Sequence, residues 1–350
     1  MTHYAGVTRR RVPLPGTLAF AALALACGSA DSGGGDGGGA GGGAGRIVDG
    51  GGADAGGGGD AGADAGTPGV SVVTYNILHG LGNEDPPAGE YDGFGDRLPI
   101  IAAELARRRP DVVMLQEVFA GGGDGYPDVI KTLRAAMNSG AGDRYTVIFG
   151  PINGQPPTKN SGSAFGQITM TRLPIVSYAN YSVVEVEEMS PRSVLHARIT
   201  AGGRDVDFFN AHLQGPDDPT AAATEMNDVL AFIDATSVPG GIAVLGGDLN
   251  SPDSAPLYDV LRAAEFSEAG AMAGLICTPA NNSGCTNSTI PLREPGNRTS
   301  KRLDYVFLRG AALDPAGCGL VFAEPVNLDG GVLWPSDHIG MGVWLVIAPQ

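Results

Sequence analysis

Acidic, amide and imidazole side chains stand at the ends of apolar stretches along much of this sequence. One such stretch ends in "TYN", another in "FFNAH" and another in "LGGDLN", and the last one opens with "PSDH". A buried carboxylate is costly unless it is paired, hydrogen-bonded or bound to a cation. We therefore expect these side chains to gather at one rim of the fold. The positions are Asn76, Glu117, Asn210, His212, Asp248, Asn250, Asp304, Asp337 and His338.

The residue types in this set support a narrow range of chemistry. Carboxylate and amide oxygens are hard ligands that suit Mg²⁺, and also Mn²⁺ or Ca²⁺, rather than soft metals. Histidines donate or accept protons near neutral pH. The sequence has neither a G-x-S-x-G turn around a serine nucleophile nor a phosphate-binding P-loop. The set therefore predicts attack of water on a phosphorus centre, assisted by a bound cation.

Strands and helices that could position these side chains alternate along the chain after residue 69. The β-branched run 70–76 and the apolar runs 111–118 and 241–247 predict strands, the latter two buried on both faces. Apolar residues at helical spacing predict helices at 96–109, 126–139, 219–236 and 253–265. Further strands are expected at 144–149, 164–170, 175–186, 193–199, 205–211, 303–309 and 339–347, and an irregular polar region at 270–300. Two packed sheets with helices outside fit this order.

Six ordered segments of the sequence resemble one known family. They are "TYNILHG", "DVVMLQEV", "FFNAHLQ", "GGDLNSP", "RLDYVF" and "PSDHIGM", and together they resemble the endonuclease/exonuclease/phosphatase superfamily, the deoxyribonuclease-I-like proteins. Each segment alone is a weak signal, but the ordered set spans residues 70–348. The resemblance implies an α/β fold, a four-layer sandwich in which two packed mixed β-sheets are flanked by helices. It also implies a phosphoesterase that depends on a divalent cation.

The resemblance assigns a cation-binding role to three of the side chains. Glu117 resembles the principal metal ligand of the family, and Asn76 lies beside it in the family pattern. Asp337 resembles a second carboxylate on the metal side. The cation implied is Mg²⁺, with Mn²⁺ or Ca²⁺ as alternatives.

The resemblance assigns proton transfer and phosphate binding to the others. Asp248 resembles the group that orients or deprotonates the attacking water, and Asp304 resembles the partner that fixes the ring of His338. His338 then faces the phosphate as a base or as an electrostatic stabiliser, and His212 is expected to be the general acid toward the leaving group. Contact with substrate is expected from Asn76, Asn210 and Asn250. Which residue takes the first proton is open at this point.

One position departs from the family pattern. In the deoxyribonuclease branch the histidine that resembles His212 is paired with a Glu from a middle strand, but residues 158–175 contain no Asp or Glu. The resemblance therefore supplies no carboxylate partner for His212 and weakens a specific assignment as a deoxyribonuclease. Arg172 and Arg192 could reach a phosphate, although arginines on the surface of a strand are commoner.

The first 69 residues predict an exported protein. Residues 1–27 have a basic start and the apolar run "VPLPGTLAFAALALA", and "LALAC" resembles the cleavage site of a bacterial lipoprotein signal. Cleavage there makes Cys27 the lipidated N-terminus of a membrane-anchored envelope protein. Secretion without a lipid is the alternative. Glycine makes up half of residues 28–69, which predicts a flexible linker before a catalytic domain at 70–350.

The net charge and the positions of the cysteines further limit the kinds of binding site to expect. The net charge of −16 argues against a broad electrostatic footprint for nucleic acid, without excluding a local basic groove. No C-x-x-C is present, so a structural zinc site is not expected. Cys277 and Cys285 flank a polar loop and are one of three possible disulfide pairs with Cys318, as an oxidising compartment allows.

The sequence thus predicts a metal-dependent hydrolase of phosphodiesters, with a nuclease-like substrate favoured. A phospholipase C or sphingomyelinase type of activity, acting on a phospholipid headgroup, is an alternative, as is phosphomonoester hydrolysis. A catalytically idle binding module on the same fold is the non-enzyme alternative. The expected partners are the phosphate ester and, through the lipid anchor, a membrane; no obligate protein partner is evident.

Overall fold

The structure is a computed structural model of the 350-residue chain. It describes residues 2–4, 69–78, 94–120, 128–140, 142, 144–152, 164–186, 191–215, 218–253, 255–287, 292–295, 299–310, 313–328 and 331–348. Contacts divide the chain into two units, one of Met1–Arg10 with Ala61–Gln350 and one of Arg11–Asp60, and every described residue lies in the first. Cys27 and the region predicted to be a signal peptide lie outside the described residues, apart from 2–4, and so does the predicted linker up to residue 68.

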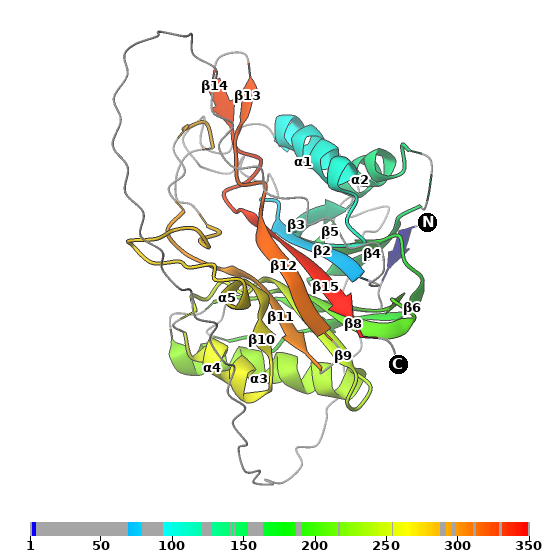
Figure 1. Ribbon diagram of the computed structural model, residues 1–350, viewed down its shortest axis with the longest axis vertical. Coiled ribbons are helices and arrows are strands. Elements are labelled where there is room, and N and C mark those ends of the chain that lie inside the picture. Colours follow the sequence, from blue (N-terminus) through cyan, green and yellow to red (C-terminus); the bar gives the residue numbers. More distant parts are fainter. Residues whose placement is uncertain are drawn as a thin grey trace, which may run out of the picture. The chain divides into compact units, whose positions relative to one another are not determined.

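The first sheet, sheet A, has seven strands. Their order is β1 (Thr2–Tyr4), β4 (Thr146–Pro151), β5 (Ala164–Thr171), β3 (Val112–Ala120), β2 (Gly69–Asn76), β15 (Gly340–Ile347) and β12 (Leu313–Val321). The pairs β1–β4 and β2–β3 are parallel and the others antiparallel, so the sheet is mixed. Helices α1 (Phe94–Arg108) and α2 (Val129–Met137) lie over it (Figure 1).

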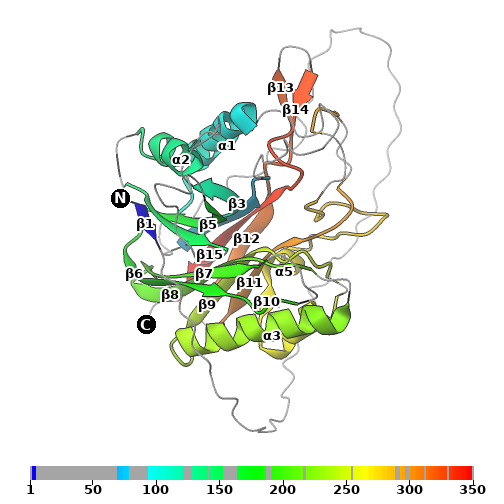
Figure 2. The ribbon, with the colours of Figure 1, turned by 180° about the vertical axis from the view of Figure 1, so that it is seen from behind.

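The second sheet, sheet B, has six strands. Their order is β10 (Ser267–Glu268), β11 (Asp304–Arg309), β9 (Ile242–Asp248), β8 (Arg204–His212), β7 (Ser193–Ala201) and β6 (Ile175–Ser182). Helices α3 (Pro219–Thr236) and α4 (Pro256–Ala263) lie along the face turned away from sheet A (Figure 2). The short helix α5 (Ala269–Met272) and a ribbon of β13 (Val326–Leu328) and β14 (Gly331–Leu333) complete the elements of the described residues.

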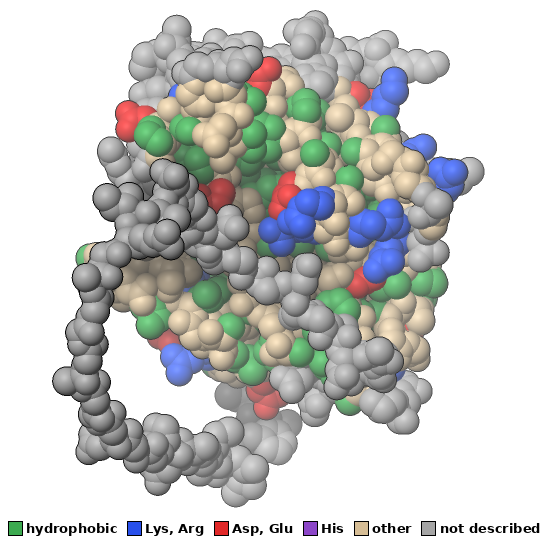
Figure 3. Space-filling model, turned by 45° about the horizontal axis from the view of Figure 1, so that its top comes forward, with side chains coloured by type: hydrophobic (Ala, Val, Ile, Leu, Met, Phe, Trp, Pro, Cys, Tyr) green, Lys and Arg blue, Asp and Glu red, His purple; other side chains and the backbone are tan. Residues whose placement is uncertain are grey.

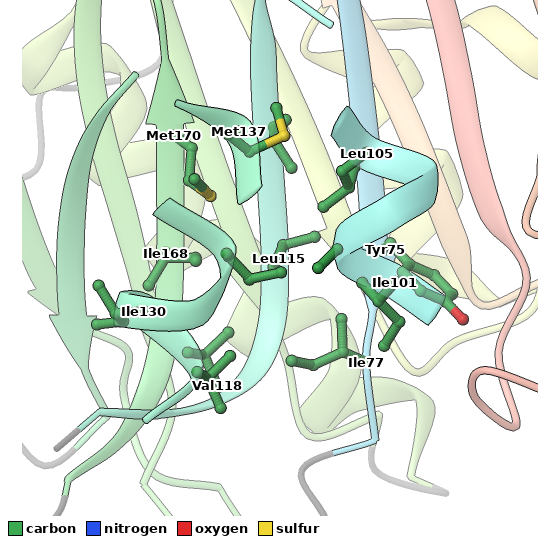
Figure 4. Packing of buried hydrophobic residues seen from close by; sticks show 14 of the residues in the cluster. Tyr75, Ile77, Ile101, Leu105, Leu115, Val118, Ile130, Met137, Ile168 and Met170 are labelled. Atoms are coloured by element: carbon green, nitrogen blue, oxygen red, sulfur yellow. The ribbon is translucent and has the colours of Figure 1, made fainter. Parts of the chain in front are cut away.

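Three apolar layers hold these elements together. The first lies between sheet A and its helices, where Leu98, Ile101 and Leu105 of α1 repeat at helical spacing and are buried. Figure 4 shows Ile101 and Leu105 among the other buried residues of this layer. The second lies between the two sheets, and the third lies between sheet B and α3 and α4. The predicted α/β fold, a four-layer sandwich of two mixed sheets flanked by helices, is therefore confirmed.

Most boundaries of the predicted elements agree with the structure, but the edge strands β1, β10 and β12 were not predicted. The helices predicted at 96–109 and 126–139 are Phe94–Arg108 and Val129–Met137, and the strand predicted at 175–186 ends at Ser182. Strand β12 was not predicted, because "LDPAGCGLV" contains proline and glycine. It lies at the edge of sheet A, where proline is tolerated, and its pairing is irregular between Pro315 and Gly317.

No helix among the described residues has the length and hydropathy needed to cross a bilayer.

Strand pairing brings the polar ends of both sheets to one side. In sheet B, Asp248 at the end of β9 pairs with His212 of the parallel strand β8 and with Asp304 of the antiparallel strand β11. In sheet A, Asn76 at the end of β2 pairs with Gln116 of the parallel strand β3. The register of these five strands thus sets which side chains meet at this end.

Two glycines of "LGGDLN" let the backbone pass between close neighbours just before Asp248. Gly247 has φ +143°, a conformation that L side chains rarely adopt, and a Cβ there would collide with the Ala211 carbonyl group on β8. A Cβ on Gly246 would collide with the Met114 side chain from sheet A. Only glycine fits at position 247, whereas a Cβ at position 246 would require the Met114 side chain to move.

We expect Gly247→Ala to lower the free energy of unfolding by at least about 2 kcal/mol, because the new Cβ combines a disfavoured φ with a backbone collision. Urea unfolding followed by circular dichroism measures the change. The control is Gly319→Ala on strand β12, where a Cβ meets no atom within 4 Å and φ is not in the positive range; a change within about 0.5 kcal/mol is expected. Equal stability of the two variants would contradict this view of Gly247.

Candidate active site

Asp248 lies at the centre of the polar rim. Its side chain is buried, and its Oδ2 accepts a hydrogen bond of 2.9 Å from Asn76 Nδ2. The same oxygen lies 3.6 Å from His212 Nε2 and 3.7 Å from His338 Nε2. Its Oδ1 accepts a bond of 2.8 Å from the backbone N–H of Asn250. Two strands of sheet B, the segment before β15 and the end of β2 therefore meet at one carboxyl group.

The position of Asp248 changes its acidity. Burial raises the pKa of Asp248 to about 7, although the neighbouring His338 and the bond from Asn76 oppose the rise. A carboxyl group that takes up a proton near neutral pH is suited to accept one from water. Because this pKa belongs to the protein without a cation, bound positive charge nearby would lower it.

His338 is held by Asp304 through a hydrogen bond of 2.8 Å between Nδ1 and Oδ2. Both side chains are buried. Burial alone would lower the pKa of His338, but Asp304, Asp248 and Asp337 together raise it well above its usual 6.5. This pair therefore stabilises the fold below the pKa of an unfolded histidine, and the contribution disappears as pH rises through the raised pKa.

A polar segment from the irregular region closes over this pair. Thr286 Oγ1 accepts from the backbone N–H groups of Leu303 and Asp304 at 3.0 and 3.1 Å, and its carbonyl group accepts from Ile339. Asn287 places its side-chain nitrogen 3.1 Å from His338 Nε2. Directly before this segment, Cys285 forms a disulfide with Cys277, one of the three pairings that the sequence allowed. Cys318 is a free, half-buried thiol whose pKa burial raises to about 12.

Glu117 lies at an irregularity in strand β3. The pairing of β3 with β5 shifts between Leu115 and Val118, and Glu117 has φ +58°. This left-handed conformation costs a non-glycine residue about 1–2 kcal/mol and marks sites where the surrounding structure imposes it. Glu117 Oε1 accepts a bond of 3.0 Å from Asn76 Nδ2 and lies 3.8 Å from His212 Nε2. The irregularity thus turns the Glu117 carboxylate toward the rim.

Asp337 provides a second carboxylate near Glu117. Burial raises the pKa of Asp337; the charge of His338 opposes this rise, the negative charge of Glu117 adds to it, and Ser336 and Arg97 oppose it more weakly. Two neighbouring carboxylates in a half-buried site repel each other, and a divalent cation relieves that repulsion. The carboxylates of Glu117 and Asp337 therefore fit a hard cation; Asn76 would join them only through Oδ1, which here accepts from the backbone N–H of Leu78 at 3.0 Å.

A second arrangement of possible metal ligands is more compact. One ligand atom from each of Asp248, Asp304 and His338 lies within 4.8 Å of the others. Asp304 Oδ2 and His338 Nδ1 already bind each other, so a cation could use these two atoms only by displacing that hydrogen bond. We therefore favour the Glu117 side for the cation.

Arg97 was not singled out by the sequence, yet it supports the rim. It is the largest fully buried side chain, and it donates to the carbonyl groups of Ile77, Leu78 and Pro335 at 2.7–2.8 Å. These bonds tie the end of β2 to the segment that carries Asp337. The sequence signal that could have found it is an arginine beside the apolar residues of a predicted helix, in "DRLPII".

Among the described residues, an arginine lies on Nδ1 of His212. Arg192 Nη1 lies 3.2 Å from His212 Nδ1. The middle strand β5 contributes Gln167, which bonds to Ser193 and not to His212. The other candidate arginine, Arg172, forms an ion pair of 2.7 Å with Asp111 and so serves a structural role.

The expectation that Asn210 contacts substrate was wrong. Its side chain is fully buried, donates to the carbonyl groups of Leu115 and Ile168, and accepts from Gln116 at 2.7 Å. Asn210 therefore links the two sheets below the rim, where amide groups must be fully paired. Asn250 lies at the rim with φ +50° and donates from Nδ2 to the Leu213 carbonyl group.

Comparison with known families and structures agrees with this arrangement. A model of the Endonuclease/Exonuclease/phosphatase family matches residues 73–338. An endonuclease/exonuclease/phosphatase family protein from Bacteroides thetaiotaomicron aligns with TM-score 0.65 and 18% identity over 81% of this chain and 99% of its own. A mannosyl-6-phosphatase of the same species aligns with TM-score 0.62 and 19% identity over 79% and 100%.

A human structure has the same fold. The Nocturnin catalytic domain with a bound sulfate anion aligns with TM-score 0.58 and 17% identity over 80% of this chain and 94% of its own. At these identities the alignments show the fold alone. The comparison with curated proteins returned no match.

We expect Asp304→Asn to lower the pKa of His338, because the substitution removes the nearest negative charge from a buried imidazole. An NMR titration of the histidine ring signals in the presence of a chelator measures the change. His196→Asn serves as the control that assigns the signals of the other buried, carboxylate-paired histidine, which bonds to Asp207. A pKa of His338 that is the same in Asp304→Asn and in the parent would show that the pair does not act as described.

Proposed function

The chain belongs to the endonuclease/exonuclease/phosphatase family, whose members hydrolyse phosphoester bonds, and we propose that it is a divalent-cation-dependent phosphodiesterase. The observation that carries the proposal is the position of Asp248 Oδ2, within 3.7 Å of two imidazole Nε2 atoms and bonded to an amide that also binds Glu117. Such a group of a base, two imidazoles and a cation-binding carboxylate suits in-line attack of water on phosphorus.

Glu117, Asn76 and Asp337 would hold the cation. When bound, it supplies positive charge next to the phosphoryl oxygens, which lowers the energy of the charge that develops there. Asn76 also donates to Asp248, so it connects the cation-binding residues to the residue that handles water.

Asp248 would orient the attacking water and accept its proton. Asn76 and the Asn250 backbone fix its two oxygens, so the carboxyl group cannot rotate away from the rim. Its pKa of about 7 without a cation suits a base that works near neutral pH.

His338 and His212 would contact the phosphate from two sides. Asp304 keeps His338 positively charged at neutral pH, so its ring stabilises negative charge on the phosphoryl group. His212 would donate a hydrogen from Nε2 toward the leaving group. Both Nε2 atoms point to Asp248, so the reacting phosphoryl group would lie in front of that carboxyl group.

A nuclease-like diester is the favoured substrate, in spite of the net charge of −16. The surface is hollowed on one face, where acidic side chains stand next to a group of Lys and Arg side chains (Figure 3). Such local positive charge can bind a polyanion on a protein that is acidic overall. Phospholipid headgroups are the other diester source.

Phosphomonoester hydrolysis is the second candidate. Arg192 adds a cation beside His212, and a terminal phosphoryl group with two negative charges gains more from an additional cation than a diester does. One of the similar structures is described as a mannosyl-6-phosphatase, which supports the candidate at the level of the fold.

We expect Glu117→Gln to weaken Mg²⁺ binding and to reduce kcat/KM on the best substrate by at least about 100-fold, because it removes a charged ligand while keeping the shape of the side chain. Calorimetric Mg²⁺ titration and a panel of DNA, RNA, sphingomyelin, a sugar phosphate and a bis-aryl phosphodiester measure the two effects. Glu104→Gln on the exposed side of α1 is the matched control, with both values unchanged.

Two outcomes would contradict the proposal. Unchanged Mg²⁺ affinity in Glu117→Gln would place the cation elsewhere. Binding of Mg²⁺ by the parent protein with no turnover of any substrate in the panel would indicate an idle binding module on this fold.

We further propose that the protein is exported and anchored by a lipid on Cys27, with plain secretion as the alternative. The disulfide between Cys277 and Cys285 supports an oxidising compartment. We expect Cys27→Ser to abolish incorporation of labelled palmitate and to release the protein from the membrane fraction. Cys318→Ser, which changes the free thiol of the described residues, is the control. Lipid labelling that persists in Cys27→Ser would exclude this anchor.

A further inference from the structure

His212 has an unusual neighbour for a histidine of a hydrolytic site. Arg192 immediately precedes strand β7, whose first residue Ser193 pairs with His212 on β8, so the two side chains lie next to each other at the same end of sheet B. The distance between Arg192 Nη1 and His212 Nδ1 is 3.2 Å, which is within hydrogen-bonding range.

The chemistry of the guanidinium group decides the direction of this hydrogen bond. Arginine carries only N–H donors and has no acceptor atom, and it keeps its charge in proteins. His212 Nδ1 must therefore accept, which leaves the ring hydrogen of His212 on Nε2. A carboxylate partner would instead accept a hydrogen from Nδ1, and in a neutral ring it would leave Nε2 with its lone pair.

Acidic side chains on three elements favour the charged form of Arg192. Burial lowers the pKa of the Arg192 guanidinium, whereas Glu117, Asp248 and Glu225 favour its charged form. Glu225 of α3 is fully buried, and its Oε1 accepts a bond of 2.9 Å from the backbone N–H of Gln214, two residues after His212. The acidic side chains that favour the charged form of Arg192 thus belong both to the rim and to the helix bonded to the loop that follows His212.

The two histidines of the rim have opposite hydrogen-bonding partners on Nδ1. His212 presents Nε2–H at 3.6 Å from Asp248 Oδ2 and 3.8 Å from Glu117 Oε1. The ring of His338 is anchored through Nδ1 to an acceptor, Asp304 Oδ2. Nδ1 of His212 therefore accepts a hydrogen, because its partner is a guanidinium group, whereas Nδ1 of His338 donates one, because its partner is a carboxylate.

We propose that Arg192 is a positioning residue that holds His212 with its hydrogen on Nε2, so that His212 donates a hydrogen bond to a phosphoryl or leaving-group oxygen. This role deepens the proposed phosphoesterase function and rests on it. It assigns proton uptake from water to Asp248 and hydrogen-bond donation to His212.

The position of the ring hydrogen is measured by NMR on the full chain labelled with ¹⁵N-histidine, in the presence of a chelator and again with Mg²⁺. The ¹⁵N shifts of His212, assigned with the variant His212→Gln, should show hydrogen on Nε2 and a lone pair on Nδ1. Hydrogen on Nδ1 of the parent protein, in a neutral or a charged ring, would overturn the proposal, and this readout needs no substrate.

Kinetic comparison of two substitutions tests the consequence. Arg192→Met removes the donor and should reduce kcat by about 100-fold with little change in KM, as loss of one donor to the transition state does. Arg192→Lys keeps an N–H donor and the charge, and it should retain the ring hydrogen on Nε2 and kcat within about tenfold. The control is Arg198→Met on the same strand, whose arginine binds Asp207 and not the rim.

Two kinetic results would also overturn the proposal. A parental kcat and KM in Arg192→Met would mean that Arg192 does not act through His212. A rise in KM alone would mean that Arg192 only binds substrate. Absence of activity on every phosphate ester would refute the proposed function, whereas the NMR result would still decide the arrangement of Arg192 and His212.

Discussion

The burial of Asp248 is the constraint on which the rest of the site depends. Its carboxyl group is almost inaccessible to water, and an isolated charge in such a place would cost several kcal/mol. Asn76, the Asn250 backbone and two imidazoles satisfy it instead, and each of them comes from a different part of the chain. The site and the packing of the two sheets are therefore parts of the same electrostatic arrangement.

Backbone conformations of low population surround this carboxyl group. Gly247 precedes Asp248 with φ +143°, Asn250 follows with φ +50°, and Glu117 has φ +58° where the pairing of β3 with β5 shifts. Each costs stability, and the packing of both sheets around them compensates. Glu117 and Asn250 thus direct their side chains from backbone conformations that local stability alone does not favour.

Two residues outside the strands also hold the rim in place through hydrogen bonds. Arg97 of α1 binds carbonyl groups on both sides of the junction between β2 and the segment before β15. Thr286 joins the irregular region to Asp304 and Ile339, directly after the disulfide at Cys285. Thr286 thus binds the backbone N–H of Asp304 and that of Ile339, the residue after His338. The irregular region therefore helps to orient His338.

The sequence by itself determined the elements, their order and the polar residues at their ends, because strand and helix periodicity and the cost of buried charge are local properties. It also predicted that these residues belong together. Only the tertiary structure decided their directions: Asn210 turned out to bridge the sheets, Arg97 to brace the rim, and Arg192 to take the place where a carboxylate was sought. Those outcomes depend on strand register and on contacts between residues far apart in the chain, which no local pattern encodes.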